Sequence, residues 1–490
     1  MFRRHWLVLS GKIILLSLIC GWILYQSFGP GSTLVISLAF IGFLLLPFIF
    51  IFKSFAKHVL FVILLLTMAF NIDQTLFIQN HNGGAAGFVI SLNGLVLLIL
   101  FMICIYESFQ KQEFNHHLFK PEVFVLLGLN LAALISLAVA RDRLLGLYEW
   151  LELTKMMGIF LYLRYALISR QFSLSLILHV IVICIAMQGV VGLLQYSTGS
   201  TLNLTILGGQ SETVAQKTPL NTLSRVGGTL GGPNAFAWYL DFVLPIPISI
   251  LLLAKKKRNL LMNIIAVVLG LLALYLTLSR GGWLGILVSG IIILAVLTKR
   301  LHPMKRFYII LIMILIALIG LVLILGIANP VRDRFLAEDG GSAYVRIPLM
   351  HVAVNIIQHN PIFGIGLNNY TLVHHEYDFT EGKVSTYFPY PVHNIFFQLA
   401  AEIGILGLIL FLLFLGIMLY QAIQLTRQED PFISALGVGL MASIVGGMIQ
   451  AQVENATIGA AQLLPLWILA GLISGLWEKE STSKFESQHE

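Results

Sequence analysis

A histidine stands where a long polar stretch ends and a strongly apolar run begins. His393 follows Pro389 and Pro391, which restrict the backbone before it, and Asn394 is a residue type that can cap the helix predicted after it. An imidazole with a pKa of about 6.5 can be neutral at neutral pH and accept a proton from a hydroxyl group. A buried histidine satisfied by its neighbours is the alternative. Because the turn directs the ring outward, we interpret this junction as a reaction centre.

A second candidate is an arginine between two apolar runs. Arg280 is followed by Gly281 and Gly282, and the segment predicts a very short turn between two helices. The two glycines permit a tight backbone and the close approach of a ligand. A guanidinium group is always charged and donates in a planar fork, which suits phosphate or pyrophosphate. Contacts with lipid headgroups, or capping of the preceding helix, would explain the same arginine equally well.

Two further arginines lie in long polar segments. Arg225 opens the glycine-rich segment 225–234, which predicts turns and can also present backbone amides to an anion at the start of the next helix. Arg346 precedes a predicted amphipathic helix that ends near Asn360, where proline and glycine follow. Both arginines are therefore candidates for holding an anionic ligand.

The composition places these residues in a membrane protein. Of the 490 residues, 58% are hydrophobic and 11% are charged, and the mean hydropathy is +0.89, whereas soluble proteins have about 25% charged residues. A bilayer core of about 30 Å needs roughly 20 apolar residues per helix, and such runs follow one another along the chain. We predict an all-α polytopic membrane protein with about 12–14 transmembrane helices and a large extracytoplasmic loop before a late helix.

The predicted spans are apolar runs between polar breaks, and they are residues 10–28, 31–52, 58–77, 86–106, 122–140, 147–168, 173–195, 234–254, 259–279, 283–298, 307–328, 394–424, 432–452 and 457–477. The span 147–168 holds Glu149, Glu152 and Lys155, and an interfacial helix is an alternative there.

The positions of lysine and arginine predict the orientation. Short cytoplasmic loops retain positive charge, and the basic clusters fall on one side of the predicted spans: 3–4, 53–57, 255–258, 299–300 and 305–306. We therefore expect both termini in the cytoplasm. The net charge of +7 is then a signal of topology and gives no evidence for nucleic-acid binding.

We predict one transmembrane domain over residues 1–477 with two outer loops, 196–233 and 329–392, the larger of which contains short helices. A polar cytoplasmic tail, 478–490, follows and is expected to be disordered.

Carboxylates inside the predicted spans are interpreted as structural. Glu402 is nine residues after His393, which on an ideal helix is about 13.5 Å deeper, so direct contact between them is not expected. Asp241 is expected to pair within the bundle. The chain has no Asp-x-Asp pattern, and the segment Glu376-Tyr377-Asp378 is only a weak metal candidate. We therefore expect no metal requirement.

Three short motifs together resemble the O-antigen ligase and O-antigen polymerase superfamily. They are Ser279-Arg280-Gly281-Gly282, the Arg346 segment followed by Pro361-x-Phe363-Gly364-x-Gly366, and His393-Asn394 followed by Glu402-x-Gly404-x-x-Gly407. The segment from Arg225 to Asn234 also resembles it. The resemblance covers roughly residues 220–420, and the first 200 residues or so match only as generic membrane helices.

The resemblance implies a metal-independent, inverting glycosyltransferase of the bacterial plasma (inner) membrane that needs no cofactor. Its donor would be a glycan on undecaprenyl pyrophosphate, and its acceptor would be a hydroxyl group of a lipid or of another glycan. Arg280 and Arg346 would hold the pyrophosphate, with Arg225 as a weaker addition, and His393 would activate the acceptor. Further candidates for substrate binding are Gly281, Gly282 and Asn394.

Other functions remain open. A flippase or another transporter of lipid-linked oligosaccharides would also have many spans, although transporters often show paired halves and here the larger outer loop occurs only in the second half. A protein O-oligosaccharyltransferase would use the same donor with a protein hydroxyl group as acceptor. Ligase and polymerase activities differ only in the acceptor, and no residue decides between them.

Overall fold

The computed structural model describes residues 53–111, 120–209, 214–217, 222–254, 259–299, 304 and 342–489. The helices up to residue 299 are α3 (Lys53–Leu66), α4 (Leu92–Lys111), α5 (Pro121–Ser136), α6 (Arg143–Ile168), α7 (Leu174–Thr198), α8 (Pro233–Val243), α9 (Pro245–Leu253), α10 (Leu260–Leu276) and α11 (Arg280–Lys299). The later helices are α14 (Ser342–His359), α15 (Tyr370–Val373), α16 (Val384–Tyr387), α17 (Ile395–Thr426), α18 (Pro431–Gln450) and α19 (Leu464–His489). Short 3-10 turns are η2 (Thr67–Ala69), η4 (Leu204–Leu207), η5 (His374–Tyr377) and η6 (Ala461–Leu463).

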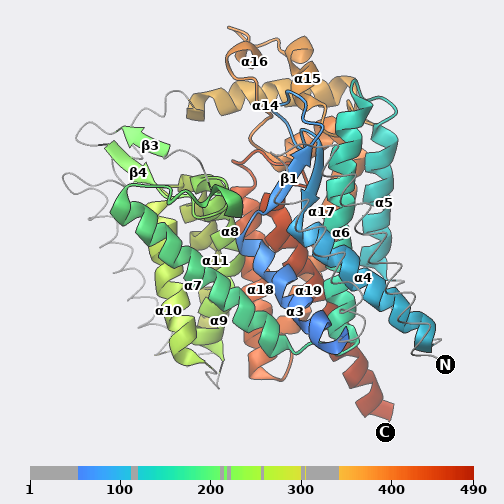
Figure 1. The fold of residues 1–490 in the computed structure, drawn as a ribbon, viewed down its shortest axis with the longest axis vertical. Helices are drawn as coiled ribbons and strands as arrows, with labels where there is room; N and C mark the ends of the chain where they lie inside the picture. The colour runs from blue at the N-terminus through green and yellow to red at the C-terminus, as the bar shows by residue number, and fades with distance from the viewer. Residues whose placement is uncertain are drawn as a thin grey trace, which may run out of the picture.

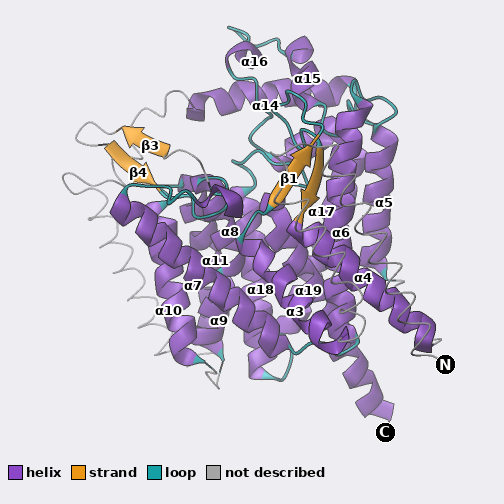
Figure 2. Cartoon of the chain, viewed as in Figure 1, coloured by secondary structure: helices purple, strands orange, loops and turns teal. Residues whose placement is uncertain are grey.

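Strands are few in the described part of the chain. Two antiparallel hairpins occur, β1 (Asp73–Leu76) with β2 (Phe88–Ser91) and β3 (Val214–Lys217) with β4 (Thr222–Arg225), and Figure 2 shows them beside an otherwise helical bundle. The prediction of an all-α membrane protein is confirmed. Seven described helices are long and apolar enough to cross a membrane, and three shorter apolar helices accompany them.

Some predicted spans are placed differently or lie outside the described residues. The predicted spans 10–28, 31–52 and 307–328 lie outside them. The predicted span 58–77 is wrong at its end, because the helix stops at Leu66 and the polar residues from Asp73 onward form a strand. The tail expected to be disordered is also corrected, since α19 continues to His489.

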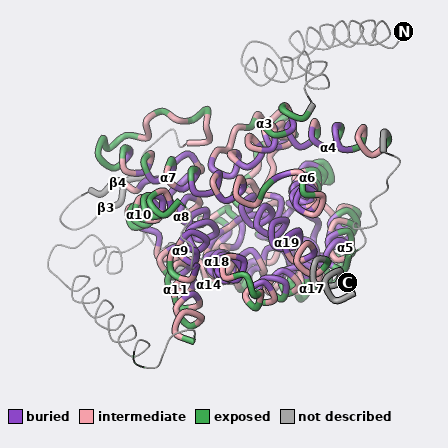
Figure 3. Tube along the Cα trace, turned by 90° about the horizontal axis from the view of Figure 1, so that it is seen from below, coloured by how far each residue is buried: buried purple, intermediate pink, exposed green. Residues whose placement is uncertain are grey.

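The centre of the bundle is formed by long, largely apolar helices. Figure 3 shows α8, α18 and α19 surrounded by other elements, and these segments are the most enclosed of the long apolar helices. The close approach of these helices to their neighbours depends on small residues, as is common in membrane bundles. At Gly446 of α18, an added Cβ would lie 2.8 Å from the carbonyl oxygen of Gly285 in α11. The indole of Trp238 donates to the carbonyl of Gly447 at 2.7 Å, which joins α8 to the same helix.

Helix α17 is broken at Gly404, and the loop that follows α14 supplies the backbone hydrogen-bond partners that are lost at the break. Gly404 has φ 82° and ψ 176°. In an unbroken helix, the Ile405 N–H would donate to the Ala401 carbonyl. Here it donates to Pro361 at 2.8 Å, while the Ala401 carbonyl accepts from Ile365 at 3.0 Å. The two segments therefore exchange backbone hydrogen bonds, and the helix can change direction without losing them.

The same loop is held by side chains on both of its sides. The Glu402 carboxylate is buried and accepts from the Asn368 N–H at 3.0 Å, which agrees with its predicted structural role. The Asn368 side chain accepts from the Gly84 N–H at 2.6 Å and donates to the Ala85 carbonyl at 2.8 Å. The connection between β1 and β2 thus reaches the segment before α15, far along the chain.

Helix α14 lies across one end of the bundle, and the C-terminal end of α19 lies at the opposite end (Figure 1). In α14, the side chains of Leu349, Val352, Ala353 and Ile356 are buried, whereas Ile347 is exposed. The predicted amphipathic helix is therefore confirmed, and its end at His359 agrees with the predicted stop near Asn360. It begins earlier than predicted and includes Arg346.

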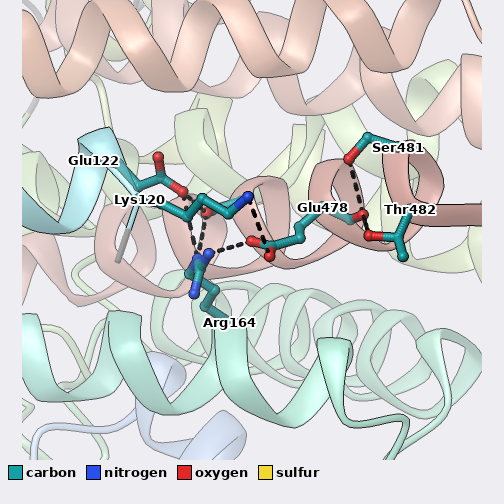
Figure 4. A network of polar contacts seen from close by, with 7 residues as sticks. Lys120, Glu122, Arg164, Glu478, Ser481 and Thr482 are labelled. Carbon is teal, nitrogen blue, oxygen red and sulfur yellow. Dashed lines mark hydrogen bonds and ion pairs between the residues drawn. The ribbon is translucent and has the colours of Figure 1, made fainter. Parts of the chain in front are cut away.

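An ion network joins three helices away from α14. The Arg164 guanidinium in α6 donates to Ser474 at 3.0 Å and to Glu478, both in α19, and its Nε lies 3.4 Å from Glu122 in α5 (Figure 4). Arg164, Glu122 and Glu478 are nearly inaccessible to solvent, while the partly exposed Lys120 lies 3.6 Å from Glu478. Burial of these charges is tolerated because they face one another.

Substituting Gly404 with alanine should destabilise the protein. A Cβ there would lie 2.0 Å from the Ile362 carbonyl oxygen, and the φ value is unfavourable for an L side chain. We expect a loss of about 1–3 kcal/mol in unfolding free energy, measured by tryptophan fluorescence during thermal unfolding in detergent. Gly416→Ala in the same helix is the control, because nothing lies within 4 Å of its added Cβ. Equal midpoints for the two variants would contradict this account of the break.

Substituting Arg164 with methionine should cost about 3–5 kcal/mol, because Glu122 would remain buried without the cation that faces it. Adding Glu122→Gln and Glu478→Gln to this variant should restore much of the stability. Arg141→Met is the control, since its ion pair with Glu376 is about half exposed and contributes little. Thermal unfolding compares the variants, and an Arg164 variant as stable as the Arg141 variant would refute the role of the network.

Candidate active site

His393 lies in the short turn that enters α17. Asn394 caps this helix, as predicted, and its side chain accepts from the backbone N–H groups of Phe396 and Phe397 at 3.0 and 3.2 Å. The ring of Phe388 packs beside the imidazole, with centroids 5.4 Å apart. The Nδ1 atom of His393 is buried and has no hydrogen-bond partner among the described residues. The ring is therefore positioned by packing and by the cap, with one nitrogen available.

The pKa of His393 falls to about 4, because burial disfavours the charged ring and the nearby charge of Arg346 disfavours it further. The imidazole is consequently neutral across the physiological range, which is the form that can accept a proton.

Arg346 is carried to His393 by the packing of α14. The buried face of that helix belongs to an apolar cluster with Val392, the residue before His393, and with Ala401 of α17. The Nε atom of Arg346 is buried and lacks a hydrogen-bond partner within the described residues. Part of this guanidinium is thus removed from water with a donor unused, in the position where an anionic ligand would satisfy it.

Arg225 joins three segments at the same end of the bundle. Its Nε donates to the Thr277 carbonyl at 2.8 Å, in the turn after α10, and a terminal nitrogen donates to Asn234 Oδ1 at 2.7 Å, at the start of α8. These contacts orient the guanidinium between β4, α8 and the turn before α11.

Arg280 is the first residue of α11, so the structure places it inside the helix and not in a turn between helices. Gly281 and Gly282 lie in the same first turn, where both are needed for packing. An added Cβ at Gly281 would lie 2.7 Å from Val453, and one at Gly282 would lie 2.7 Å from Ala237. This close packing sets the first turn of α11 against α8 and against the loop that follows α18.

A carboxylate that the sequence reasoning did not select lies among these residues. Glu454 is in the loop after α18, is 9% exposed, and lies within range of the charges of Arg346 and Arg225. Burial raises the pKa of Glu454 to about 7, against the opposing effects of both arginines and of a hydrogen bond with Gln450. The one available signal was its place between the predicted spans 432–452 and 457–477, on the side of the arginines, and this signal does not show which residues it meets.

The loop that carries Glu454 is anchored on several sides. The Gln450 amide donates to the Asn234 carbonyl at 3.0 Å. Asn394 donates to the Gln452 side chain at 2.9 Å, and the Ala451 carbonyl accepts from Ile395 at 3.1 Å. The entrance of α17 and the end of α18 therefore hold each other in place, and Asn394 is used for this contact as well as for the cap.

Other carboxylates singled out in the sequence have different surroundings. Asp241, expected to pair within the bundle, is buried, and neither of its oxygens has a hydrogen-bond partner in the described part of the chain. In the segment 376–378, predicted as a weak metal candidate, Glu376 forms an ion pair with Arg141 at 2.5 Å. Asp378 accepts hydrogen bonds from the backbone N–H groups of Thr380 and Ser385 in its own loop. These contacts give both carboxylates a structural explanation.

Fold and site define a polytopic membrane protein with arginines, a neutral imidazole and a carboxylate grouped at one end of an apolar bundle. Residues 265–412 match the family model described as O-antigen ligase. This match contains Arg280, Arg346 and His393, and it confirms the superfamily that the motifs predicted, that of the O-antigen ligases and polymerases. Over this stretch the chain is similar to O-antigen ligases, and the match supports a membrane enzyme of the O-antigen ligase or polymerase type. Arg225 and Glu454 lie outside the matched stretch. No curated protein matches the sequence.

Proposed function

We propose that the protein transfers a glycan from an undecaprenyl-pyrophosphate carrier to an acceptor hydroxyl group, on the outer face of the plasma membrane and without a metal ion. The observation that supports this proposal best is the grouping of Arg225 and Arg346 with His393 at one end of an apolar bundle. Such an end can receive both a water-borne hydroxyl group and the headgroup of a donor that is anchored in the bilayer.

The arginines suit the pyrophosphate of such a donor. Arg346 has an unused buried nitrogen, and the guanidinium of Arg225 is already oriented by Thr277 and Asn234. Arg280 begins a helix whose first turn offers backbone N–H groups and a partial positive charge. As the glycosidic bond breaks, negative charge develops on the leaving lipid pyrophosphate, and fixed cations at the interface stabilise it.

His393 acts on the acceptor in this proposal. The imidazole takes the proton of the acceptor hydroxyl group while the hydroxyl oxygen forms a bond to the anomeric carbon of the donor glycan. The bond between that carbon and the pyrophosphate oxygen breaks at the same time, and its electron pair leaves with the lipid pyrophosphate. In the protein alone, burial and Arg346 hold the pKa of His393 at about 4, where the ring is a weak base. A bound pyrophosphate places negative charge near Arg346 and raises that pKa, so the base strengthens when the donor is present.

The outer face is favoured by the charges at the helix ends. Helices α11 and α17 both begin at the end that carries the site. They run to Lys299 and Arg427 at their other ends, which is the distribution expected when those ends are cytoplasmic. The site would then face the compartment that lacks nucleotide sugars, where a lipid-linked donor is required.

Transfer should be lost when His393 is replaced by alanine. We expect a fall in rate of at least 100-fold, roughly the contribution of a general base, with unchanged membrane insertion and abundance. The assay incubates purified protein with a lipid-pyrophosphate glycan and candidate acceptors and separates the products by size. His375→Ala is the control, because His375 is exposed on η5. Normal product from the His393 variant would remove the assigned base.

The same assay identifies the acceptor. A ladder of lengths would indicate polymerisation, a single step onto a lipid would indicate ligation, and a single step onto a protein would indicate a protein O-oligosaccharyltransferase. Movement of the lipid-linked glycan across a vesicle without any new glycosidic bond would instead identify a flippase.

Substituting Arg280 with lysine should reduce turnover by about tenfold, because a lysine point charge cannot reproduce two parallel donors to one phosphate. Arg143→Lys is a matched control, since Arg143 is exposed at the start of α6 and, among the described residues, donates a long contact of 3.4 Å to the Ala138 carbonyl. A wild-type rate for the Arg280 variant would show that bidentate binding of phosphate is not required.

A further inference from the structure

Glu454 lies close enough to feel the charges of Arg346 and Arg225, two of the arginines proposed to bind the donor. The carboxylate is 9% exposed and lies within range of both Arg346 and Arg225. Without the donor, the ionised carboxylate of Glu454 is attracted by both arginines. A diphosphate bound to the same guanidinium groups would bring two further negative charges next to a buried carboxylate.

Like charges at a buried site are strongly unfavourable, and protonation of one group removes the conflict. Displacement of the carboxylate is restricted here, because the loop is tied to Asn234 through Gln450 and to Asn394 through Gln452. Protonation is easily reached, since the pKa of Glu454 is about 7 before any anion arrives. An anion on Arg346 and Arg225 weakens the two interactions that lower this pKa, and it therefore raises the pKa further.

We propose that Glu454 is a positioning residue that takes up one proton when the diphosphate of the donor binds to Arg225 and Arg346. This inference rests on the proposed function, because it takes the donor to be a diphosphate. Without the donor, the ionised carboxylate balances part of the charge of the two guanidinium groups. In the complex the neutral carboxyl group donates a hydrogen bond to a phosphate oxygen. The proton comes from water and returns to it when the lipid pyrophosphate leaves.

Charged and titratable groups surround Glu454 from several elements. Arg346 comes from α14 and Arg225 from the end of β4. The first turn of α11, packed on Val453, carries Arg280, and the turn before α17, bonded to Ala451, carries His393. A guanidinium group is always charged in proteins. The pKa of His393 is about 4 in the free protein, below this range, so a Glu454 variant separates the two contributions.

The test is equilibrium binding of a soluble P1,P2-dialkyl diphosphate to the full-length protein in lipid nanodiscs between pH 6 and pH 9. Both phosphates of this diester stay singly ionised throughout, so the probe itself does not titrate. Wild-type affinity should be nearly constant below pH 7 and fall by about tenfold per pH unit above it, as linkage to one proton requires. Calorimetry in buffers of different ionisation enthalpy should give uptake of nearly one proton at pH 8.

Glu454→Gln, which resembles the protonated residue, should bind with an affinity independent of pH in this range and without proton uptake at pH 8. At that pH it should bind about tenfold more tightly than the wild type. Glu381→Gln is the matched control, because Glu381 is an exposed carboxylate of the loop before α16, and it should keep the wild-type slope.

Three results would overturn the inference while leaving the proposed donor site intact: a wild-type affinity that does not change with pH, the same slope in Glu454→Gln, or loss of binding by that variant at every pH. Absence of binding to the wild type would overturn the proposed function together with the inference. Loss of binding in Arg346→Met, with wild-type binding present, supports the location of the diphosphate on which the inference depends.

Discussion

The exchange of backbone hydrogen bonds between the break in α17 and the loop after α14 determines how the rest of the site is arranged. Gly404 interrupts the helix, and the loop from Pro361 to Gly366 supplies the missing partners. This fixes where α14 ends and where the first part of α17 points. Arg346 lies on the first of these helices and His393 at the entrance of the second. Their proximity is therefore a consequence of a main-chain contact made about three turns away from the imidazole.

The electrostatic balance of the site differs from that of the other buried ion cluster. Around Arg164, the carboxylates of Glu122 and Glu478 face the cation directly, and the side chains bond to one another. At the candidate active site, Arg346 keeps an unused buried donor and the imidazole of His393 an unused nitrogen within the described residues. A cluster whose charged groups all have partners stabilises the packing of its helices. A buried donor and a buried ring nitrogen without partners are instead typical of a binding site.

Sequence reasoning identified the residues whose local pattern carries information. The junction at His393 and its cap at Asn394 follow from prolines and a polar residue before an apolar run, and the end of α14 follows from the proline and glycine after it. Gly404 and Gly364 were present in the motifs, but their function depends on a contact between two distant segments. Glu454 was missed for the same reason, because an isolated carboxylate in a short outer loop has no local signature of the arginines that it meets.

The hydrogen-bond network around Asn368 has a consequence for how the matched stretch can fold. The side chain of this residue is shared with the connection between β1 and β2 and with Leu145 of α6, and these partners precede the matched stretch 265–412 by more than a hundred positions. The matched stretch is therefore not a separable module, because its loop at Asn368 is completed by main-chain and side-chain groups from the first half of the chain.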